Sequence, residues 1–332
     1  MINVGFIGLG NMARAQISSF EPIRGCRLYA GADPSEEARA LTSQSFAGMK
    51  LFTNHKELLA DPGIDAVVVA TPTLFHKNTV IDAMRAGKPV MTEKPMARTV
   101  SDCRKMIEVS KKTRQLLMVA HCRRFDSIWG AWGKAVTSGR IGGPVVWRDV
   151  SSGRNGGWFM DEKIGGGPLI DGAVHNYDFA NMMWGDPISV IASSIKLNKK
   201  VSAVDTATAV VEYPRGNKLM MSWSWATRGS RMFDILGSTG SITTGTGSLT
   251  PPDNSTRGQS FYCLTDSKGK EKLITAKGTS GEMYVKQARH FLDCVQGKKK
   301  CISPAKEAIK AVAVAEAVLK ASPKGQARKV TW

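Results

Sequence analysis

Short apolar runs alternate with longer amphipathic stretches over the first 120 residues of the chain. The runs are residues 2–7, 26–32, 65–70, 88–92 and 116–120. Strands that are apolar at nearly every position are typical of a parallel sheet covered on both faces. The stretches between several of these runs carry helical spacing. The alternation therefore predicts an α/β fold with a doubly wound parallel sheet.

From about residue 144 the pattern changes to longer segments in which apolar and polar positions alternate. The candidate strands are residues 144–151, 189–197, 205–213, 218–226 and 232–236. A period of two indicates strands that bury one face, and the turn between the third and fourth candidates predicts a hairpin. This half is therefore expected to be α+β, built on an open, largely antiparallel sheet.

Three further segments complete the second half. The Gly-, Ser-, Thr- and Pro-rich tract 238–258 is expected to be a surface excursion. Helical patterns cover 281–295 and 304–321. A length of 332 residues suffices for two domains with separate cores, and we place them at 1–121 and 122–332.

The first strand leads directly into Gly8-Leu9-Gly10-Asn11-Met12-Ala13, which is followed by a helical pattern. This is G-x-G-x-x-A in the context of a Rossmann dinucleotide-binding domain. Gly8 allows a tight turn, Gly10 lets a pyrophosphate approach the backbone, and Ala13 lets the helix pack closely on the strand. The N–H groups at Asn11 and Met12 are expected to face the phosphates.

Asp33 follows the second strand, 20 residues beyond Ala13. A carboxylate there can accept hydrogen bonds from both ribose hydroxyls of NAD and repels the 2′-phosphate of NADP. The sequence therefore favours NAD, while Arg39 nearby leaves NADP open. Asp33 could also be a helix N-cap, which is compatible with the ligand role.

The next two strands also end in polar residues. Thr71, Pro72 and His76 follow one, and Glu93 and Lys94 follow the other. Ligands of doubly wound sheets lie outside the carboxyl ends of the strands, so these residues are predicted to join the cofactor site. Lys94 precedes a proline and is expected to be held over that site, although an ordinary surface lysine is the alternative.

The segment Gly165–Asp178 carries three consecutive glycines and a proline, then two proton-handling side chains, Asp171 and His175. If the run is helical, their i,i+4 spacing puts both on one face. A histidine beside a carboxylate is a common general base near neutral pH. The alternative is a buried helix whose histidine only satisfies its hydrogen bonds.

Composition narrows the possible functions. The net charge is +18, but Lys and Arg are spread along the chain and no nucleic-acid motif accompanies them, so nucleic-acid binding is disfavoured. No apolar run is long enough to cross a bilayer, and the first residues do not resemble a signal peptide. Six scattered cysteines without a Cys-x-x-Cys pair indicate reduced thiols of a cytoplasmic protein. The five dispersed histidines argue against a metal site.

Five motifs in order resemble those of the Gfo/Idh/MocA oxidoreductases, the relatives of glucose–fructose oxidoreductase and inositol dehydrogenase. The motifs are Gly8–Ala13, Ala70-Thr71-Pro72 with His76, Glu93-Lys94-Pro95, Arg123–Asp126 and Gly165–His175. The resemblance covers essentially the whole chain. It implies NAD(P)-dependent oxidation or reduction of a sugar or cyclitol, and an open-sheet domain that often mediates oligomers, here a homodimer or homotetramer.

The resemblance also implies residue roles. Lys94 matches the lysine of the family's Glu-Lys-Pro motif, and Asp171 and His175 match its aspartate and catalytic histidine. On this basis His175 is the expected general acid/base, with Asp171 and Lys94 orienting the hydroxyl. Further candidate substrate contacts, each of which could instead be structural, are Arg123, Asp126, Asn155, Trp158, Asn176 and Tyr284.

Two other functions remain open. One is a glycoside hydrolase of the same superfamily, which oxidises its substrate transiently and releases free sugar without accumulating NADH. The other is a non-catalytic NAD-binding sensor, which is expected to lack Lys94 or His175, and both are present. The sequence indicates neither the substrate nor the direction of the reaction.

Overall fold

The structure is a computed structural model that describes residues 1–229, 231–244, 261–275, 281–321 and 327–332. The chain forms two compact units. The first unit holds residues 1–122 and 281–309, and the second holds 123–280 and 310–332. This division differs from the contiguous split after residue 121, because a segment near the end of the chain returns to the first unit. No helix among the described residues is long and apolar enough to cross a membrane.

The first unit is built on a six-stranded parallel sheet in the order β3-β2-β1-β4-β5-β6. Its strands are β1 Ile2–Ile7, β2 Cys26–Ala32, β3 Lys50–Phe52, β4 Ala66–Val69, β5 Val90–Thr92 and β6 Leu117–Val119. Every residue of β4 is buried, as expected for a strand covered on both faces. The predicted doubly wound parallel sheet is confirmed.

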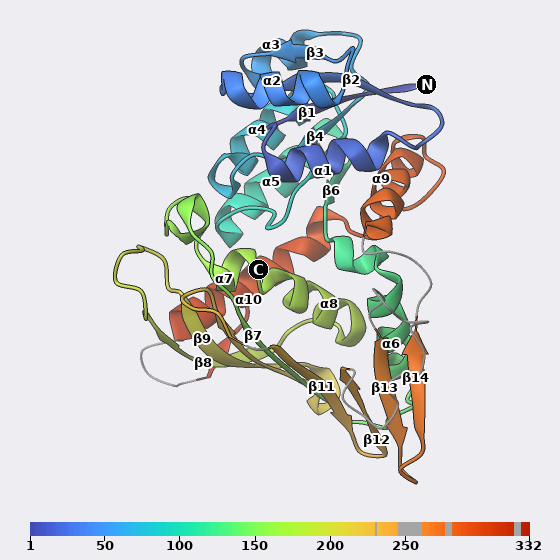
Figure 1. Ribbon diagram of the computed structural model, residues 1–332, viewed down its shortest axis with the longest axis vertical. Coiled ribbons are helices and arrows are strands. Elements are labelled where there is room, and N and C mark those ends of the chain that lie inside the picture. Colours follow the sequence, from blue (N-terminus) through green and yellow to red (C-terminus); the bar gives the residue numbers. More distant parts are fainter. Residues whose placement is uncertain (230, 245–260, 276–280, 322–326) are drawn as a thin grey trace. The chain divides into compact units, whose positions relative to one another are not determined.

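Among the described residues, six helices lie wholly in the first unit. They are α1 Asn11–Phe20, α2 Glu36–Ser45, α3 His55–Ala60, α4 Thr73–Arg85, α5 Val100–Thr113 and α9 Glu282–Val295. Figure 1 shows α9 beside α1, although the two are far apart in the sequence. The chain after α9 also contacts β6: Val119 N–H donates to Ser303 O at 3.0 Å, and Ser303 Oγ donates to Val119 O at 2.8 Å. These contacts explain why residues 281–309 join this unit.

The second unit is built on a nine-stranded sheet in the order β14-β13-β12-β11-β7-β10-β9-β8-β15. Its strands are β7 Val146–Ser152, β8 Ser189–Ile195, β9 Thr206–Glu212, β10 Lys218–Ser224, β11 Arg231–Gly237, β12 Gly240–Thr244, β13 Phe261–Asp266, β14 Glu271–Thr275 and β15 Arg328–Lys329. β7 and β10 pair in parallel, whereas the other neighbours are antiparallel. The predicted open, largely antiparallel sheet is confirmed.

The second unit also contains helices, which Figure 1 shows on one side of this sheet. They are α6 Ser127–Thr137, α7 Pro168–Asp171, α8 Val174–Trp184 and the later part of α10 Ala305–Ala321; short 3₁₀ turns cover Cys122–Phe125, Gly157–Met160 and Pro214–Gly216. The core contains an aromatic cluster around the fully buried Trp132. Its ring centroid lies 5.1 Å from that of Trp147, 4.8 Å from that of Phe179 and 5.4 Å from that of Phe233.

One expectation was wrong for part of the tract 238–258. β12 lies inside this tract and pairs with β11 and β13, and Ile242 is fully buried. A single large apolar residue among Gly, Ser and Thr gave too weak an alternation to recognise as a strand. Residues 245–258 of the tract lie outside the described residues. β13 and β14 were also not predicted.

Candidate active site

The fingerprint loop adopts the backbone expected for holding a dinucleotide. Gly8 has φ +85°, and a Cβ there would lie 2.8 Å from the backbone of Ala70 and Thr71 at the end of β4. Gly10 precedes α1, no side chain caps the first turn of this helix, and a Cβ on Gly10 would meet nothing within 4 Å. Ala13 is fully buried. The loop thus leaves room beside exposed helix N–H groups, as a pyrophosphate needs.

Asp33 holds this loop from the neighbouring strand end. Its Oδ2 accepts a hydrogen bond from Leu9 N–H at 2.7 Å, and its Oδ1 accepts one from Ser35 N–H at 2.8 Å. The N-cap of α2 is Ser35 and not Asp33, so the simple capping alternative is wrong. Each carboxylate oxygen has a second lone pair, so Asp33 can also accept from a ribose hydroxyl. Arg39 donates to Asp33 O at 2.7 Å, which fixes a cation beside this position.

His76 connects the ends of β4 and β5. Its Nε2 lies 2.8 Å from Thr71 O and its Nδ1 lies 2.9 Å from Pro95 O, and the side chain is 1% exposed. His76 is therefore a positioning residue for the two segments, held below the surface. Thr71 Oγ1 is buried and has no hydrogen-bond partner in the described part of the chain. Pro72 is the N-cap of α4.

Glu93 joins β5 to α1. Its Oε1 accepts a hydrogen bond from Gln16 Nε2 at 2.5 Å, and its Oε2 accepts one from Lys94 N–H at 3.1 Å. Glu93 and Gln16 are both buried, whereas Lys94 is half-buried. Gln16 is a residue of the site that sequence reasoning missed, because its contact spans 77 positions and no motif contains it.

These residues fit a bound dinucleotide. Gly8, Gly10, Asn11, Met12 and Asp33 lie at the ends of the adjacent strands β1 and β2. In the sheet order β4 lies next to β1, and β5 follows β4. The first unit therefore brings the predicted cofactor residues to the carboxyl ends of neighbouring strands. The orphaned Thr71 hydroxyl and the open space at Gly10 are features that a ligand can complete.

The glycine-rich segment of the second unit is not one continuous helix. α7 ends at Asp171 and α8 begins at Val174, so Asp171 and His175 lie on separate helices, and the condition of one helical run is not met. Gly172 lies at the break, where a Cβ would be 2.5 Å from the Trp223 ring and 2.8 Å from the Trp225 ring. Asp171 is 4% exposed, whereas His175 is half-buried.

A buried carboxylate lies in the sheet of this unit. Asp149 on β7 is fully buried, accepts a hydrogen bond from Trp223 Nε1 at 3.1 Å and lies 3.7 Å from Arg231. Burial raises the pKa of Asp149, and Arg231 and the amide of Asn176 oppose this effect. Asn176 is 2% exposed, so its position beside Asp149 favours a structural role over the predicted substrate contact.

The Arg123–Asp126 motif forms local contacts. Asp126 is the N-cap of α6 and also pairs with Arg123 at 2.8 Å. Arg124, which the sequence did not single out as a site residue, donates two hydrogen bonds of 2.7 Å to Asp178 on α8. Both partners of this ion pair are buried. The pair ties the start of the second unit to the helix that carries His175.

The remaining substrate candidates occupy two places. Asn155 and Trp158 are half-buried and follow β7, and Trp158 stacks on Phe159 with ring centroids 3.8 Å apart. Tyr284 is half-buried on α9 and belongs with Lys94 to the first unit, whereas the other substrate candidates belong to the second. Their roles in substrate binding stay predictions.

Comparison with known proteins identifies the family. Residues 2–121 match the sequence model of an oxidoreductase family with an NAD-binding Rossmann fold, and residues 132–243 match that of the GFO/IDH/MocA C-terminal domain. The chain therefore belongs to the Gfo/Idh/MocA oxidoreductases, as its five motifs predict.

Individual relatives agree with this assignment. Myo-inositol 2-dehydrogenase of Thermotoga maritima is 29% identical over 220 residues, which are 65% of this chain and 66% of that protein. The scyllo-inositol 2-dehydrogenase (NAD(+)) of Bacillus subtilis is 24% identical over 307 residues, 90% of this chain and 87% of the relative. The crystal structure of an aldose–aldose oxidoreductase from Caulobacter crescentus, complexed with glycerol, gives a TM-score of 0.85 at 23% identity and covers 99% of each chain, which shows a shared fold.

Proposed function

We propose that the protein is an NAD(P)-dependent oxidoreductase that moves a hydride between nicotinamide and a secondary hydroxyl or ketone of a sugar, sugar derivative or cyclitol. The observation that carries this proposal is the loop Gly8–Ala13, whose Leu9 N–H is held by the Asp33 carboxylate. Relatives named as inositol dehydrogenases support a cyclitol or a related polyol as substrate.

His175 is the proposed general acid/base. Oxidising a secondary alcohol removes a hydroxyl proton and a carbon-bound hydride, and the bound cofactor supplies the hydride acceptor. His175 takes the hydroxyl proton, while Asp171 and Lys94 orient the hydroxyl. The Lys94 ammonium also stabilises negative charge that develops on the oxygen. The half-buried position of His175 is compatible with access to a substrate.

Two substitutions test these roles, each with a matched control. Lys94→Ala and His175→Ala are expected to lower kcat by about 10²–10⁴-fold with NAD binding retained. Lys88→Ala and His55→Ala are the controls: Lys88 lies before β5 and donates to Ile64 O, and His55 pairs with Asp82. A near-normal kcat in either test variant on the true substrate would overturn its assignment.

The substrate is found by measuring reduced-nicotinamide absorbance with a panel of sugars, glycosides and cyclitols. NAD and NADP are supplied in parallel. We expect net reduction with one class of polyol. Release of free sugar from a glycoside without net reduction would instead identify the hydrolase, and cofactor binding without any turnover across the panel would favour the sensor.

We propose NAD as the preferred cofactor, because Asp33 places a negative charge where NADP carries its 2′-phosphate. Asp33→Ser removes this charge and leaves Arg39 beside the site. We expect the preference for NAD over NADP, measured as the ratio of kcat/KM, to fall by at least about tenfold, or about 1.4 kcal/mol. An unchanged ratio would show that Asp33 does not set cofactor choice.

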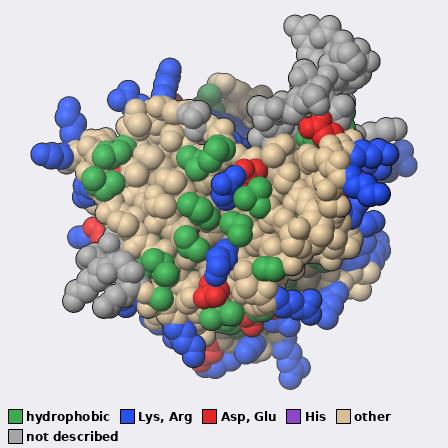
Figure 2. Space-filling view, turned by 90° about the horizontal axis from the view of Figure 1, so that it is seen from below, with side chains coloured by type: hydrophobic (Ala, Val, Ile, Leu, Met, Phe, Trp, Pro, Cys, Tyr) green, Lys and Arg blue, Asp and Glu red, His purple; other side chains and the backbone are tan. Residues whose placement is uncertain are grey.

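We also propose a homodimer or homotetramer formed through the outer face of the nine-stranded sheet. Ile191, Val210 and Met220 lie in register across β8, β9 and β10, and Met232 lies on β11. Ile191, Met220 and Met232 are 50%, 43% and 51% exposed. Figure 2 looks onto this side, where hydrophobic side chains spread across the face, with Lys, Arg, Asp and Glu side chains between some of them. Apolar faces of this kind mark interaction surfaces.

Light scattering of the purified protein tests the oligomer. Met220→Asp is expected to shift the mass toward the monomer, whereas Met182→Asp is the control, since Met182 is similarly exposed but lies on α8. A monomeric wild-type protein would overturn the proposal.

The cysteines support a cytoplasmic location, which stays a proposal. All six cysteines are free of disulfides, as expected in a reducing compartment. Fractionation of cells that express the protein at its natural level tests this location, and recovery outside the cytoplasmic fraction would contradict it.

A further inference from the structure

Three metal-binding side chains meet in the first unit, at the end of α9. His290 and Cys294 lie one helical turn apart, and Cys301 comes from the loop that follows. One ligand atom from each residue lies within 4.8 Å of the other two, and His290 Nε2 lies 3.4 Å from Cys294 Sγ. The helical pair of this cluster is one histidine and one cysteine, so it matches neither a Cys-x-x-Cys motif nor a pair of histidines.

The geometry suits a tetrahedral zinc ion. Zinc bonds of about 2.3 Å to sulfur and 2.0–2.1 Å to nitrogen put the two ligand atoms roughly 3.6 Å apart, close to the spacing of His290 and Cys294. The wider limit of 4.8 Å requires only a small movement of one side chain. Two thiolates and an imidazole are soft ligands, which favour zinc over magnesium or calcium.

The surroundings hold the three ligands in place. Ile302 N–H donates to His290 Nε2 at 3.1 Å, so this nitrogen is unprotonated, and a bound metal takes its one lone pair in place of this hydrogen bond. The next residue, Ser303, is bonded to β6, which fixes the cysteine-bearing loop at its other end. His290 is 7% exposed, whereas Cys294 and Cys301 are half-buried, so an ion can reach the thiols from solvent.

The local charge is also compatible with zinc. Lys299 pairs with Asp293 at 2.9 Å, which leaves this carboxylate engaged with a cation. A zinc ion bound to two thiolates and a neutral imidazole has no net charge. The basic residues 298–300 therefore do not repel the loaded site.

We propose that His290, Cys294 and Cys301 form a zinc site with a fourth position open to water. The bound ion holds the loop after α9 against that helix. Because Ser303 of this loop is hydrogen-bonded to β6, the ion also links α9 to β6. This site is separate from the proposed hydride transfer, because neither the fingerprint loop nor the Glu93-Lys94-Pro95 segment contributes a ligand. Its role is to stabilise the first unit.

Titration of reduced, tag-free, chelator-treated full-length protein with Co²⁺ and then Zn²⁺ tests the proposal. We expect one Co²⁺ per chain, with thiolate charge-transfer absorbance that zinc abolishes. Loss of outer partners alone weakens metal sites by roughly 10–100-fold, so Cys294→Ser and Cys301→Ser should each lower zinc affinity by about 100-fold or more. Cys26→Ser is the control, since Cys26 is half-buried but outside the cluster.

A measurement on the wild-type protein guards against variants that fold poorly. Zinc should protect Cys294 and Cys301, but not Cys26, from alkylation detected by mass spectrometry, and should raise the Tm of the wild-type protein. Equal zinc affinity in Cys301→Ser and wild type, absence of the cobalt–thiolate band, or equal alkylation with and without zinc would each overturn the site. Activity is not used as the readout, so this result is independent of the proposed function.

Discussion

The two sheets of this protein differ in which of their residues are buried. The parallel sheet of the first unit is apolar along whole strands, as in β4, and its polar residues collect at the strand ends. In the mixed sheet of the second unit, β8 alternates buried Val190 and Ala192 with exposed Ile191 and Ser193. The parallel sheet thus carries its polar residues at the carboxyl ends of its strands. The mixed sheet exposes one whole face, with side chains that alternate between buried and exposed.

The difference shows where substitutions should have their effects. In the first unit, the proposed cofactor binding depends on backbone geometry at the strand ends, so a single added Cβ is expected to block it. In the second unit, stability depends on large side chains packed against the inner face of the sheet. The outer face can change without loss of the core.

The largest effect on stability is expected for Trp132→Ala, which removes the centre of the aromatic cluster. Truncation of a buried aromatic residue costs about 3–5 kcal/mol of the free energy of unfolding. Trp158→Ala is the matched control and should cost clearly less, because Trp158 is half-buried. Urea unfolding followed by circular dichroism measures both. Equal losses would mean that the inner face of the sheet is not the main source of stability in this unit.

A second, smaller effect is expected for Gly8→Ala, compared with Gly48→Ala. Both glycines have φ +85°, but a Cβ on Gly48 meets nothing within 4 Å, whereas one on Gly8 meets the backbone of Ala70 and Thr71. Both variants should lose about 1–2 kcal/mol to the left-handed conformation. Gly8→Ala should lose a further 1–3 kcal/mol, roughly, to overpacking.

Only Gly8→Ala should also lose NAD binding, because the loop must shift to relieve the contact. Calorimetric titration of NAD into the two variants separates two effects on NAD binding. One is the contact of the new Cβ with the backbone of residues 70 and 71, and the other is the strain of a positive φ. If both variants bound NAD equally well, the close packing of this loop would not be needed for the cofactor.

The sequence predicted most of the first unit because its signals are local. Every strand of its sheet except β3, which was not predicted, is a short apolar run. The residues that follow these runs, such as Thr71 and Lys94, are placed by the sheet rule alone. The hydrogen bond from Leu9 N–H to Asp33 and that from Gln16 to Glu93 could not be predicted in this way. They depend on how strands and helices align in space.

The second unit was less predictable because long-range packing overrides local patterns. The run that contains Asp171 and His175 reads as one helix, yet the rings of Trp223 and Trp225 lie against Gly172 where the helix breaks. β12 carries few apolar residues, and its pairing with β11 and β13 defines it as a strand. The ion pair between Arg124 and Asp178 joins residues 54 positions apart, and no spacing rule indicates it.

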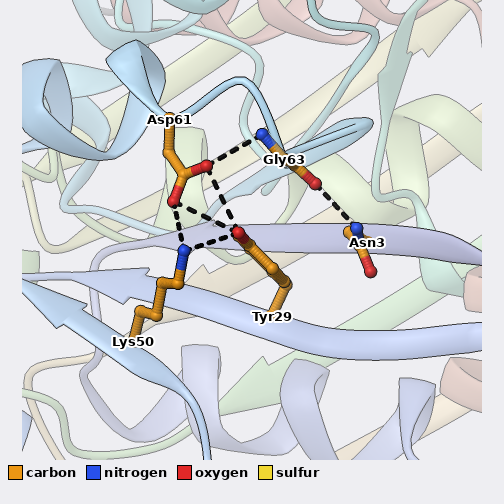
Figure 3. Close-up of polar contacts among 5 residues, drawn as sticks. All are labelled: Asn3, Tyr29, Lys50, Asp61 and Gly63. Atoms are coloured by element: carbon orange, nitrogen blue, oxygen red, sulfur yellow. Dashed lines mark hydrogen bonds and ion pairs between the residues drawn. The ribbon is translucent and has the colours of Figure 1, made fainter.

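The smallest effect concerns a polar cluster in the first unit, shown in Figure 3, that lies away from the residues of the fingerprint loop. Lys50 Nζ lies 2.9 Å from Asp61 and 2.6 Å from Tyr29 Oη, and Asp61 also accepts from Gly63 N–H. Asn3 Nδ2 donates to Gly63 O at 2.8 Å. The hydrogen bond from Lys50 lowers the pKa of Asp61, with a smaller contribution from Gly63 N–H.

The direction of the pKa shift fixes the expected pH dependence. A carboxyl whose pKa is lower in the folded state stabilises that state above its unfolded pKa of 3.8, and this contribution is lost as the pH falls through the folded value. Asp61→Asn should therefore be less stable than wild type near pH 7, and the difference should shrink as the pH falls below about 4. The effect should be small, because the Lys50 side chain is 54% exposed.

Urea midpoints of wild type, Asp61→Asn, Lys50→Met and the double variant, measured at several pH values, test this expectation. Because Lys50 supplies the main cause of the shift, Lys50→Met should flatten the acid side of the stability profile as Asp61→Asn does, and the double variant should add little. A difference between wild type and Asp61→Asn that stayed constant across the acid range would assign the stabilisation to the neutral hydrogen bonds with Gly63 and Tyr29. The charge of Asp61 would then contribute nothing to the stability of the parallel sheet.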